Sequence, residues 1–310
     1  MPLDPAAKSL LDLINSLDTI PMAEMTPQMM RGGMKLPADE DPIAMAQVEN
    51  VVIAGSAAPI DGRVYVPHSN REQLPLCLFY HGGGFVVGDL VDYDSWCRRV
   101  ADKAGVIIIS VNYALAPEYK FPQGPDDCYQ SLLWSEANAS RYGGDKHKIA
   151  VMGDSAGACM AAVVCQRALA EQGPAICHQV LIYPVTDFNF ETPSYNKNGE
   201  GYFLTRERMQ WFWNHYLAAA EQGVLPYASP IRSDSLSGLP SATVITAEYD
   251  PLLDEGKHYA DKLSSHGVNT TYRMYKGMFH GFVSFINMLE QADQSIDFIA
   301  SQLQQSFSET

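Results

Sequence analysis

Two kinds of hydrophobic pattern alternate along most of this chain. Short runs rich in apolar and β-branched residues begin after Val48, and windows with helical spacing separate most of them. The predicted strands cover residues 49–54, 63–67, 76–80, 106–112, 149–153, 180–183, 243–247 and 271–275. Continuous apolar runs such as Val106–Ile109 are typical of strands that are buried on both faces. The pattern therefore predicts an α/β fold with a mostly parallel sheet between layers of helices.

Two stretches depart from this regular alternation. A hairpin is expected around Asp61-Gly62, which would add an antiparallel edge to the sheet. The connection between strands 180–183 and 243–247 has about 59 residues, whereas a crossover needs only a dozen or so. Its clearest element is a helix that begins after Thr205, an expected N-cap. One face of this helix carries Met209, Phe212, Trp213 and Tyr216. We therefore expect an inserted segment at about 188–225.

The first 45 residues have a helical pattern of their own. Leu10, Leu13, Ile14 and Leu17 fall on one predicted helix face. A more irregular stretch follows, with Met22, Met25, Met29, Met30 and Met34. Methionine side chains adapt easily to neighbouring apolar surfaces. This segment is expected to cover a core or to line an apolar pocket.

Composition and charge exclude several classes of protein. A chain of 310 residues can bury about three quarters of its surface, and 46% hydrophobic with 18% charged residues is typical of a globular protein. The net charge is −15, with 21 Lys and Arg against 36 Asp and Glu. Nucleic acid and anionic membranes are therefore unexpected partners. The longest uncharged apolar stretch, 156–165, falls short of the ~20 residues that cross a bilayer.

The six cysteines predict neither a metal site nor a disulfide framework. They include no CxxC pair and no histidine at metal-ligand spacing. The first residues lack a basic stretch followed by an apolar one, so no secretory signal is predicted. We expect a cytoplasmic protein with reduced thiols and no metal site.

Two glycine-containing motifs carry the candidate chemistry. Gly153-Asp154-Ser155-Ala156-Gly157 lies between a predicted strand and a predicted helix, which is the setting of a GxSxG nucleophile elbow. The second motif, His81-Gly82-Gly83-Gly84, follows the strand 76–80. Three successive glycines leave amide N–H groups open to a developing oxyanion. Together the motifs indicate that Ser155 is a nucleophile with oxyanion donors close to it.

A serine nucleophile needs a histidine base and a carboxylate to orient that base. In this fold type the order along the chain is serine, acid, histidine, which leaves His258, His266 and His280. The first two fall in or at the end of a charged helical stretch, whereas His280 follows strand 271–275 on a loop before Gly281. We predict His280 as the base. Three acids, Glu248, Asp250 and Asp254, compete after strand 243–247, and Asp250 is favoured because Pro251 fixes the following turn.

Six ordered motifs resemble those of the hormone-sensitive lipase family of α/β hydrolases, especially its bacterial esterases. They are HGGG at 81–84, YALAPE at 113–118, GDSAG at 153–157, YPVTD at 183–187, DPL at 250–252 and HGF at 280–282. The resemblance implies an α/β-hydrolase catalytic domain at 46–310. It implies that residues 1–45 and the insertion form a helical cap. It also implies an oxyanion hole made by the amides of Gly83, Gly84 and Ala156. Phe85, Tyr183, Phe212 and Phe282 are the candidate pocket residues, and Phe85 replaces the tryptophan common after HGGG.

The implied activity is hydrolysis of short- to medium-chain acyl esters through an acyl-enzyme on a Ser155-Asp250-His280 triad, with no metal and no organic cofactor. The sequence leaves the oligomeric state open between a monomer and a homodimer. An amidase or arylformamidase could use the same triad, since pocket shape sets the leaving group. A non-catalytic relative resembling the plant gibberellin receptor would lack the base, whereas His280 is present. A GDSL-type hydrolase is excluded because it places acid and histidine a few residues apart, and Asp250 and His280 are 30 apart.

Overall fold

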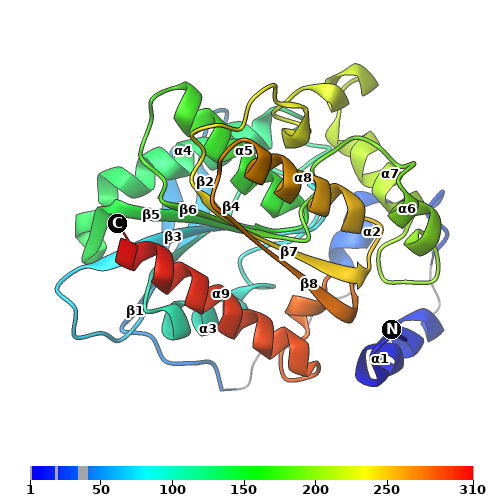
Figure 1. Ribbon diagram of the computed structural model, residues 1–310, viewed down its shortest axis with the longest axis horizontal. Helices are drawn as coiled ribbons and strands as arrows, with labels where there is room; N and C mark the ends of the chain where they lie inside the picture. Colours follow the sequence, from blue (N-terminus) through cyan, green and yellow to red (C-terminus); the bar gives the residue numbers. More distant parts are fainter. Residues whose placement is uncertain (1, 18–19, 34–40, 310) are drawn as a thin grey trace.

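The computed structural model describes residues 2–17, 20–33 and 41–309. Within them one eight-stranded sheet runs in the order β1-β2-β4-β3-β5-β6-β7-β8 (Figure 1). The strands are β1 (Gln47–Ile53), β2 (Ile60–Val66), β3 (Leu74–Tyr80), β4 (Ile107–Asn112), β5 (Gly144–Asp154), β6 (His178–Ile182), β7 (Ser241–Tyr249) and β8 (Thr270–Phe279). The pairs β1–β2 and β2–β4 are antiparallel, and the remaining pairs are parallel. The predicted strands and the mostly parallel sheet are confirmed.

Helices cover both faces of the sheet. They are α1 (Pro5–Ser16), α2 (Pro27–Gly32), α3 (Asp94–Ala104), α4 (Gln123–Asn138), α5 (Ala156–Ala170), α6 (Pro193–Asn198), α7 (Arg206–Tyr216), α8 (Leu253–Ser265) and α9 (Glu290–Glu309). Helices α3 and α9 lie together on one face, and α4, α5 and α8 lie on the other (Figure 1). None of the helices in the described ranges is long and apolar enough to cross a membrane.

The fully apolar strands divide their side chains between two cores. All seven residues of β3 are buried. Leu76 and Leu78 belong to the core under α4 and α5, whereas Cys77 and Phe79 belong to the core under α3 and α9. Successive strand residues point to opposite faces, so a strand covered on both sides must be apolar at every position. This explains why the central strands read as continuous apolar runs.

The edge hairpin exists, but its turn is not at Asp61-Gly62. Both of these residues lie inside β2, paired with Val52 and Val51. The turn is formed by residues 54–59, where the Asp127 carboxylate on α4 accepts hydrogen bonds from the N–H and hydroxyl groups of Ser56 at 3.0 and 3.1 Å. A contact from a distant helix therefore fixes the turn earlier than the local Asp-Gly signal predicts.

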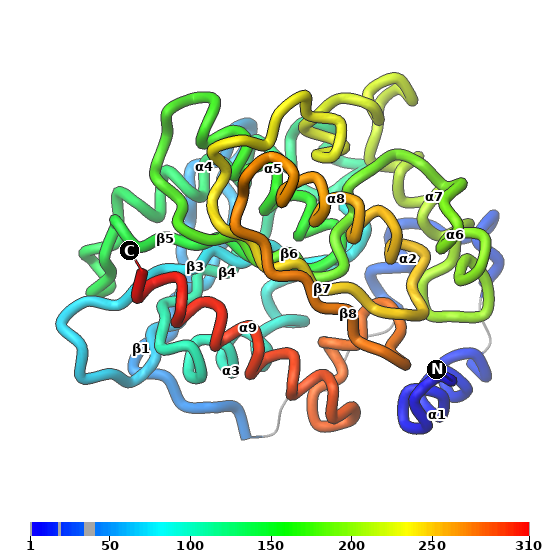
Figure 2. The backbone as a smooth tube through the Cα atoms, viewed as in Figure 1, coloured from blue at the N-terminus to red at the C-terminus, as the bar shows by residue number. Residues whose placement is uncertain are grey.

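The N-terminal helix is present with its buried face rotated from the prediction. Ala7, Leu10 and Leu11 are buried, whereas Leu13 and Leu17 are 60% and 58% exposed. The N–H of Asp4 donates to the carbonyl of Gly277 at 3.1 Å, which holds α1 beside β8 (Figure 2). With this anchor, the helix face that carries Ala7, Leu10 and Leu11 is turned toward the sheet. Met34 lies outside the described residues.

The long connection between β6 and β7 contains α6, α7 and two short 3₁₀ segments, η2 (Ala220–Val224) and η3 (Pro230–Arg232). Thr205 caps α7 as expected, because its hydroxyl accepts from the N–H of Arg208 at 3.1 Å. The predicted aromatic face is buried. The indole N–H of Trp211 donates to the carbonyl of Met25 at 3.2 Å, so the insertion contacts the N-terminal segment.

Candidate active site

Ser155 sits on a sharp turn between β5 and α5. Its backbone has φ 54° and ψ −118°, an uncommon conformation for a residue other than glycine. The two glycines of the motif are sterically required. A Cβ at Gly153 would lie 2.2 Å from the carbonyl oxygen of Gly157, and one at Gly157 would lie 1.9 Å from that of Tyr80. The sequence thus folds into the predicted elbow, with the serine at the helix N-terminus.

His280 joins Ser155 to Asp250 in a continuous chain of hydrogen bonds. Its Nε2 lies 2.9 Å from Ser155 Oγ, and its Nδ1 lies 2.7 Å from Asp250 Oδ2. The three side chains are almost completely buried. A proton on Nδ1 would be donated to the carboxylate, which leaves the Nε2 lone pair to accept the serine proton. The structure therefore brings together the three residues that the sequence selected.

The three candidate acids, one at the end of β7 and two just after it, have different partners. Asp250 faces His280, and its Oδ1 also accepts from the N–H of Leu252 at 2.8 Å. Glu248 Oε2 accepts from the N–H of Gly277 at 2.8 Å, close to the loop that carries His280. Asp254 Oδ2 accepts from the N–H of Ser194 at 2.7 Å and so ties α6 to the acid loop. Only Asp250 of these three contacts the histidine.

The glycine turn after β3 lies close to the elbow. Gly83 and Gly84 both have positive φ, 112° and 58°. A Cβ at Gly83 would lie 2.1 Å from the Val87 carbonyl oxygen, and one at Gly84 would lie 2.2 Å from the ring of Phe212. Ala156 is the first residue of α5, so its N–H has no acceptor within the helix. The arrangement can present these amides to an oxyanion.

Two of the four candidate pocket residues adjoin the catalytic groups. Phe212 comes from the insertion and lies against Gly84. The Tyr183 ring lies 4.5 Å from the His280 ring, with a backbone φ of 34°. Both aromatic side chains are buried, so they place apolar surface beside the reacting groups.

The other two candidates lie one layer farther back. Phe85 stacks on Tyr216 with ring centroids 3.9 Å apart, in the aromatic cluster of α7. Phe282 packs against Tyr275 at 4.9 Å and Tyr183 at 6.0 Å, within the core under α3 and α9. The sequence shows that both residues are aromatic, but not whether they line a pocket or pack behind the residues that line it.

Two polar residues near the site escaped prediction. Asn198 on α6 donates through Nδ2 to the carbonyls of Glu248 and Asp250, at 3.1 and 3.2 Å. Asp154 accepts from the N–H of Gly82 at 2.7 Å. Burial raises the pKa of the Asp154 carboxyl to about 6, although the Gly82 N–H and the Tyr93 hydroxyl oppose the rise. Asp154 was visible within GDSAG, whereas no local signal marks Asn198.

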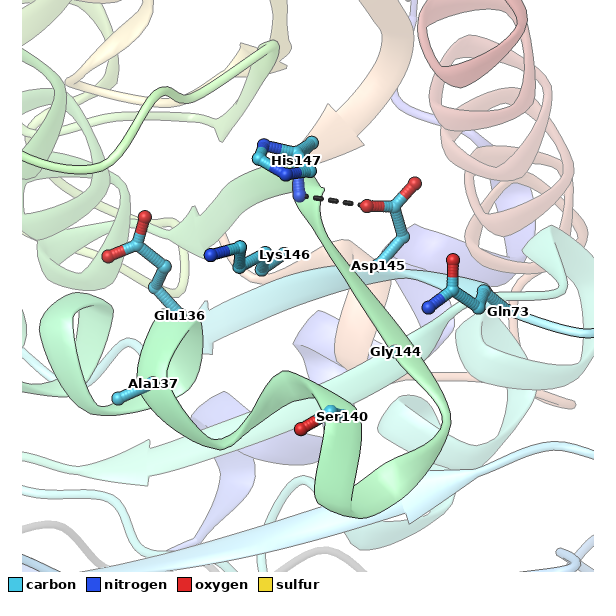
Figure 3. Close-up of a pocket in the computed structure, with 8 residues that line it drawn as sticks. All are labelled: Gln73, Glu136, Ala137, Ser140, Gly144, Asp145, Lys146 and His147. Carbon is cyan, nitrogen blue, oxygen red and sulfur yellow. Dashed lines mark hydrogen bonds between the residues drawn. The ribbon is translucent and has the colours of Figure 1, made fainter.

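Two surface pockets are lined by residues other than the triad and the proposed oxyanion donors. One of about 460 Å³ opens where β5 begins, at the opposite end of that strand from Ser155 (Figure 3). It is lined by Gln73, Glu136, Ala137, Ser140, Gly144, Asp145, Lys146 and His147. A second, of about 470 Å³, lies between Arg31, Asn112 and Asp127. No three His, Cys, Asp or Glu residues gather as metal ligands in the described parts of the chain.

Comparison with known proteins gives consistent matches. The family model of the α/β hydrolase fold matches residues 77–284. A hyperthermophilic esterase from the archaeon Pyrobaculum calidifontis has a TM-score of 0.92 and 38% identity, covering 98% of this chain and 99% of that one. An ester-hydrolase from the metagenome of Lake Arreo has a TM-score of 0.90 and 38% identity, covering 99% of both chains.

A sequence relative extends the match to a named bacterial enzyme. Carboxylesterase NlhH of Mycobacterium tuberculosis is 35% identical over 296 residues, which are 94% of this chain and 92% of that protein. These likenesses span nearly the whole chain rather than the motifs alone. The chain therefore belongs to the α/β hydrolases, in the hormone-sensitive lipase family that its motifs resemble.

Proposed function

We propose that this chain is a serine carboxylesterase that hydrolyses short- to medium-chain acyl esters. The observation that carries the proposal is the chain of hydrogen bonds from Ser155 through His280 to Asp250, at 2.9 and 2.7 Å. Relatives that match most of the chain are named carboxylesterase or esterase, which supports the same reaction. The small-molecule ester is the expected partner.

In the proposed mechanism Ser155 Oγ attacks the ester carbonyl while its proton passes to His280 Nε2. Asp250 stabilises the imidazolium that forms and remains ionised. The carbonyl oxygen becomes an oxyanion that accepts hydrogen bonds from the amides of Gly83, Gly84 and Ala156. His280 then gives its proton to the departing alcohol. Water repeats the sequence on the acyl-enzyme, releases the acid and regenerates the serine.

The proposed substrate length follows from the aromatic lining. The contacts of Phe212 with Gly84 and of Tyr183 with His280 support a narrow space for the acyl chain. Each buried methylene improves transition-state binding by about 0.8 kcal/mol until the space is full. We place the maximum between butanoyl and octanoyl esters. The net charge of −15 also disfavours adsorption to anionic lipid.

The cap boundaries and the location of the protein complete the proposal. Residues 1–45 and about 188–225 are the cap, which accords with the contact between Trp211 and Met25.

All six cysteines are free thiols, as expected in the reducing cytoplasm. Light scattering of the purified protein would decide between a monomer and a homodimer.

The test compares the purified protein with its Ser155→Ala variant on p-nitrophenyl butanoate and on the matched anilide. We expect ester hydrolysis in the wild type and a loss of at least ~1000-fold in kcat in the variant, because triad members act as a unit. Faster cleavage of the anilide than of the ester would favour the amidase instead. An active Ser155→Ala preparation free of contaminating esterase would overturn the assignment of the nucleophile.

A further inference from the structure

The aspartate of the GDSAG turn has a buried side chain that the mechanism above leaves unused. Asp154 ends β5 directly before Ser155 and is 4% exposed. Its Oδ1 accepts from the N–H of Gly82 at 2.7 Å, and its Oδ2 accepts from the hydroxyl of Tyr93 at 3.1 Å. One residue therefore joins the nucleophile's backbone to the turn that begins with Gly82.

This contact depends on close approach to a glycine. A Cβ at Gly82 would lie 2.4 Å from Asp154 Oδ2 and 3.0 Å from the Tyr93 hydroxyl. The N–H of Gly82 also points at that hydroxyl, at 3.2 Å. Hydrogen bonds to an ionised acceptor are shorter and stronger than neutral ones. The carboxylate thus holds Gly82, and the next two residues along the chain are the proposed oxyanion donors.

Asp154 is the second carboxylate that acts on His280, besides Asp250, which bonds the imidazole directly. The titratable groups that face it are Tyr93 before α3, Cys97 on α3, Tyr113 after β4, Tyr183 after β6 and His280 after β8. Burial raises the pKa of each of the three tyrosines and of Cys97. They are therefore neutral at neutral pH. Among these groups, the imidazole of His280 is the one that becomes positive during the reaction.

We propose that Asp154 is a positioning residue for ester hydrolysis. Its carboxylate holds the glycine turn in register with Ser155 and favours the positive charge that His280 acquires in the transition state. The inference rests on the proposed esterase function, which it deepens by adding a second carboxylate to the site.

The packing alone does not require this charge. An asparagine has the same shape, and its Oδ1 could accept from the N–H of Gly82. Its Nδ2 could donate to the oxygen of Tyr93. A buried carboxylate is also costly to ionise, so a residue kept only for folding would gain from being neutral. An ionised Asp154 is therefore expected if its charge increases the rate of ester hydrolysis at the expense of folding stability.

The experiment measures kcat and KM of Asp154→Asn and Tyr93→Phe on p-nitrophenyl butanoate from pH 5 to pH 9, with Tm at pH 8. We expect Asp154→Asn to lower kcat about ten- to hundredfold with KM within about twofold, as for the loss of one charge-assisted hydrogen bond. The acid limb of its kcat/KM profile moves to lower pH, because the imidazolium loses a neighbouring negative charge and releases its proton more readily. Its Tm at pH 8 does not fall.

Two comparisons separate position from charge. Tyr93→Phe keeps the carboxylate, so it lowers kcat by a smaller factor and does not move the acid limb to lower pH. Asp127→Asn is the matched control, since Asp127 is also buried and accepts from backbone N–H groups, of Ser56 and Ala114, but does not contact the triad. This control leaves kcat and the acid limb unchanged.

An Asp154→Asn enzyme with wild-type kcat, or with a lower kcat and an unmoved acid limb, would overturn the inference. So would a fall in its Tm large enough to account for the lost activity. A wild-type protein that does not hydrolyse the ester would overturn the proposed function and this inference with it. An active wild type with an unaffected Asp154→Asn variant refutes the inference alone.

Discussion

Replacing Gly84 with alanine should damage both folding and catalysis, because the new methyl group meets the insertion. The Cβ would lie 2.2 to 2.4 Å from three ring carbons of Phe212, whereas carbon atoms pack at about 3.5–4.0 Å. The ring or the glycine turn must therefore move by more than about 1 Å. The left-handed backbone at φ 58° adds a cost of about 1 kcal/mol for alanine.

The two costs can be separated with a second glycine. Gly105 has nearly the same backbone, φ 64°, and nothing lies within 4 Å of the position of its Cβ. Gly105→Ala should therefore lose about 1 kcal/mol of unfolding free energy and no activity. Gly84→Ala should lose a further 1–3 kcal/mol through crowding. If its amide is displaced from the oxyanion, kcat should fall about 100- to 1000-fold.

A double-mutant cycle with Phe212→Ala tests the contact itself. Phe212→Ala alone costs about 3–5 kcal/mol, but in the Gly84→Ala background it also removes the clash. We expect a coupling of at least about 1 kcal/mol in urea unfolding, together with partial recovery of kcat on p-nitrophenyl acetate. Additive costs within about 0.5 kcal/mol, or a Gly84→Ala protein no less stable than Gly105→Ala, would refute this reasoning.

Three further outcomes follow from the same contacts. Asp250→Asn should lower the steady-state kcat by about 10⁴, because the histidine loses its orienting carboxylate. Glu248→Gln and Asp254→Asn should lower kcat less, because these carboxylates accept hydrogen bonds from Gly277 and Ser194 instead. A larger loss of kcat in either of these two variants would contradict the assignment of Asp250. Across a series of p-nitrophenyl esters, kcat/KM should peak between butanoyl and octanoyl and fall for palmitoyl. A maximum at sixteen carbons, or activation at a lipid interface, would show that the aromatic residues beside the triad open as a lid. Burial raises the pKa of Glu255 well above its ordinary 4.5, so the folded protein keeps a proton that the unfolded chain releases. The proton therefore stabilises the folded state at low pH, and this contribution is lost as pH rises from 4.5 toward the raised pKa. The unfolding free energy of Glu255→Gln minus that of the wild type, measured with urea, should therefore be more favourable to the variant at pH 8 than at pH 4.5. An equal difference at both pH values would contradict this.

The sequence by itself determined the strands, the elbow and the base. Buried strands must be apolar at every position, so runs such as that of β4 are visible locally. The backbone of the elbow leaves no room for a Cβ at Gly153 or Gly157, so the turn is recorded in five consecutive residues of the sequence. His280 could be chosen because chain order and position after a strand are also properties of the sequence.

Contacts between distant segments decided what the sequence left open. Three carboxylates lie at the end of β7 or just after it. The choice among them depended on their contacts with Gly277, Ser194 and His280, which are distant in the sequence. The hairpin turn was misplaced because Asp127, 71 residues away from Ser56, holds it. The buried face of α1 followed from the anchor of Asp4 on Gly277. Local patterns record the backbone and the burial that a residue requires, whereas the partner of a polar group is fixed only when the chain has folded.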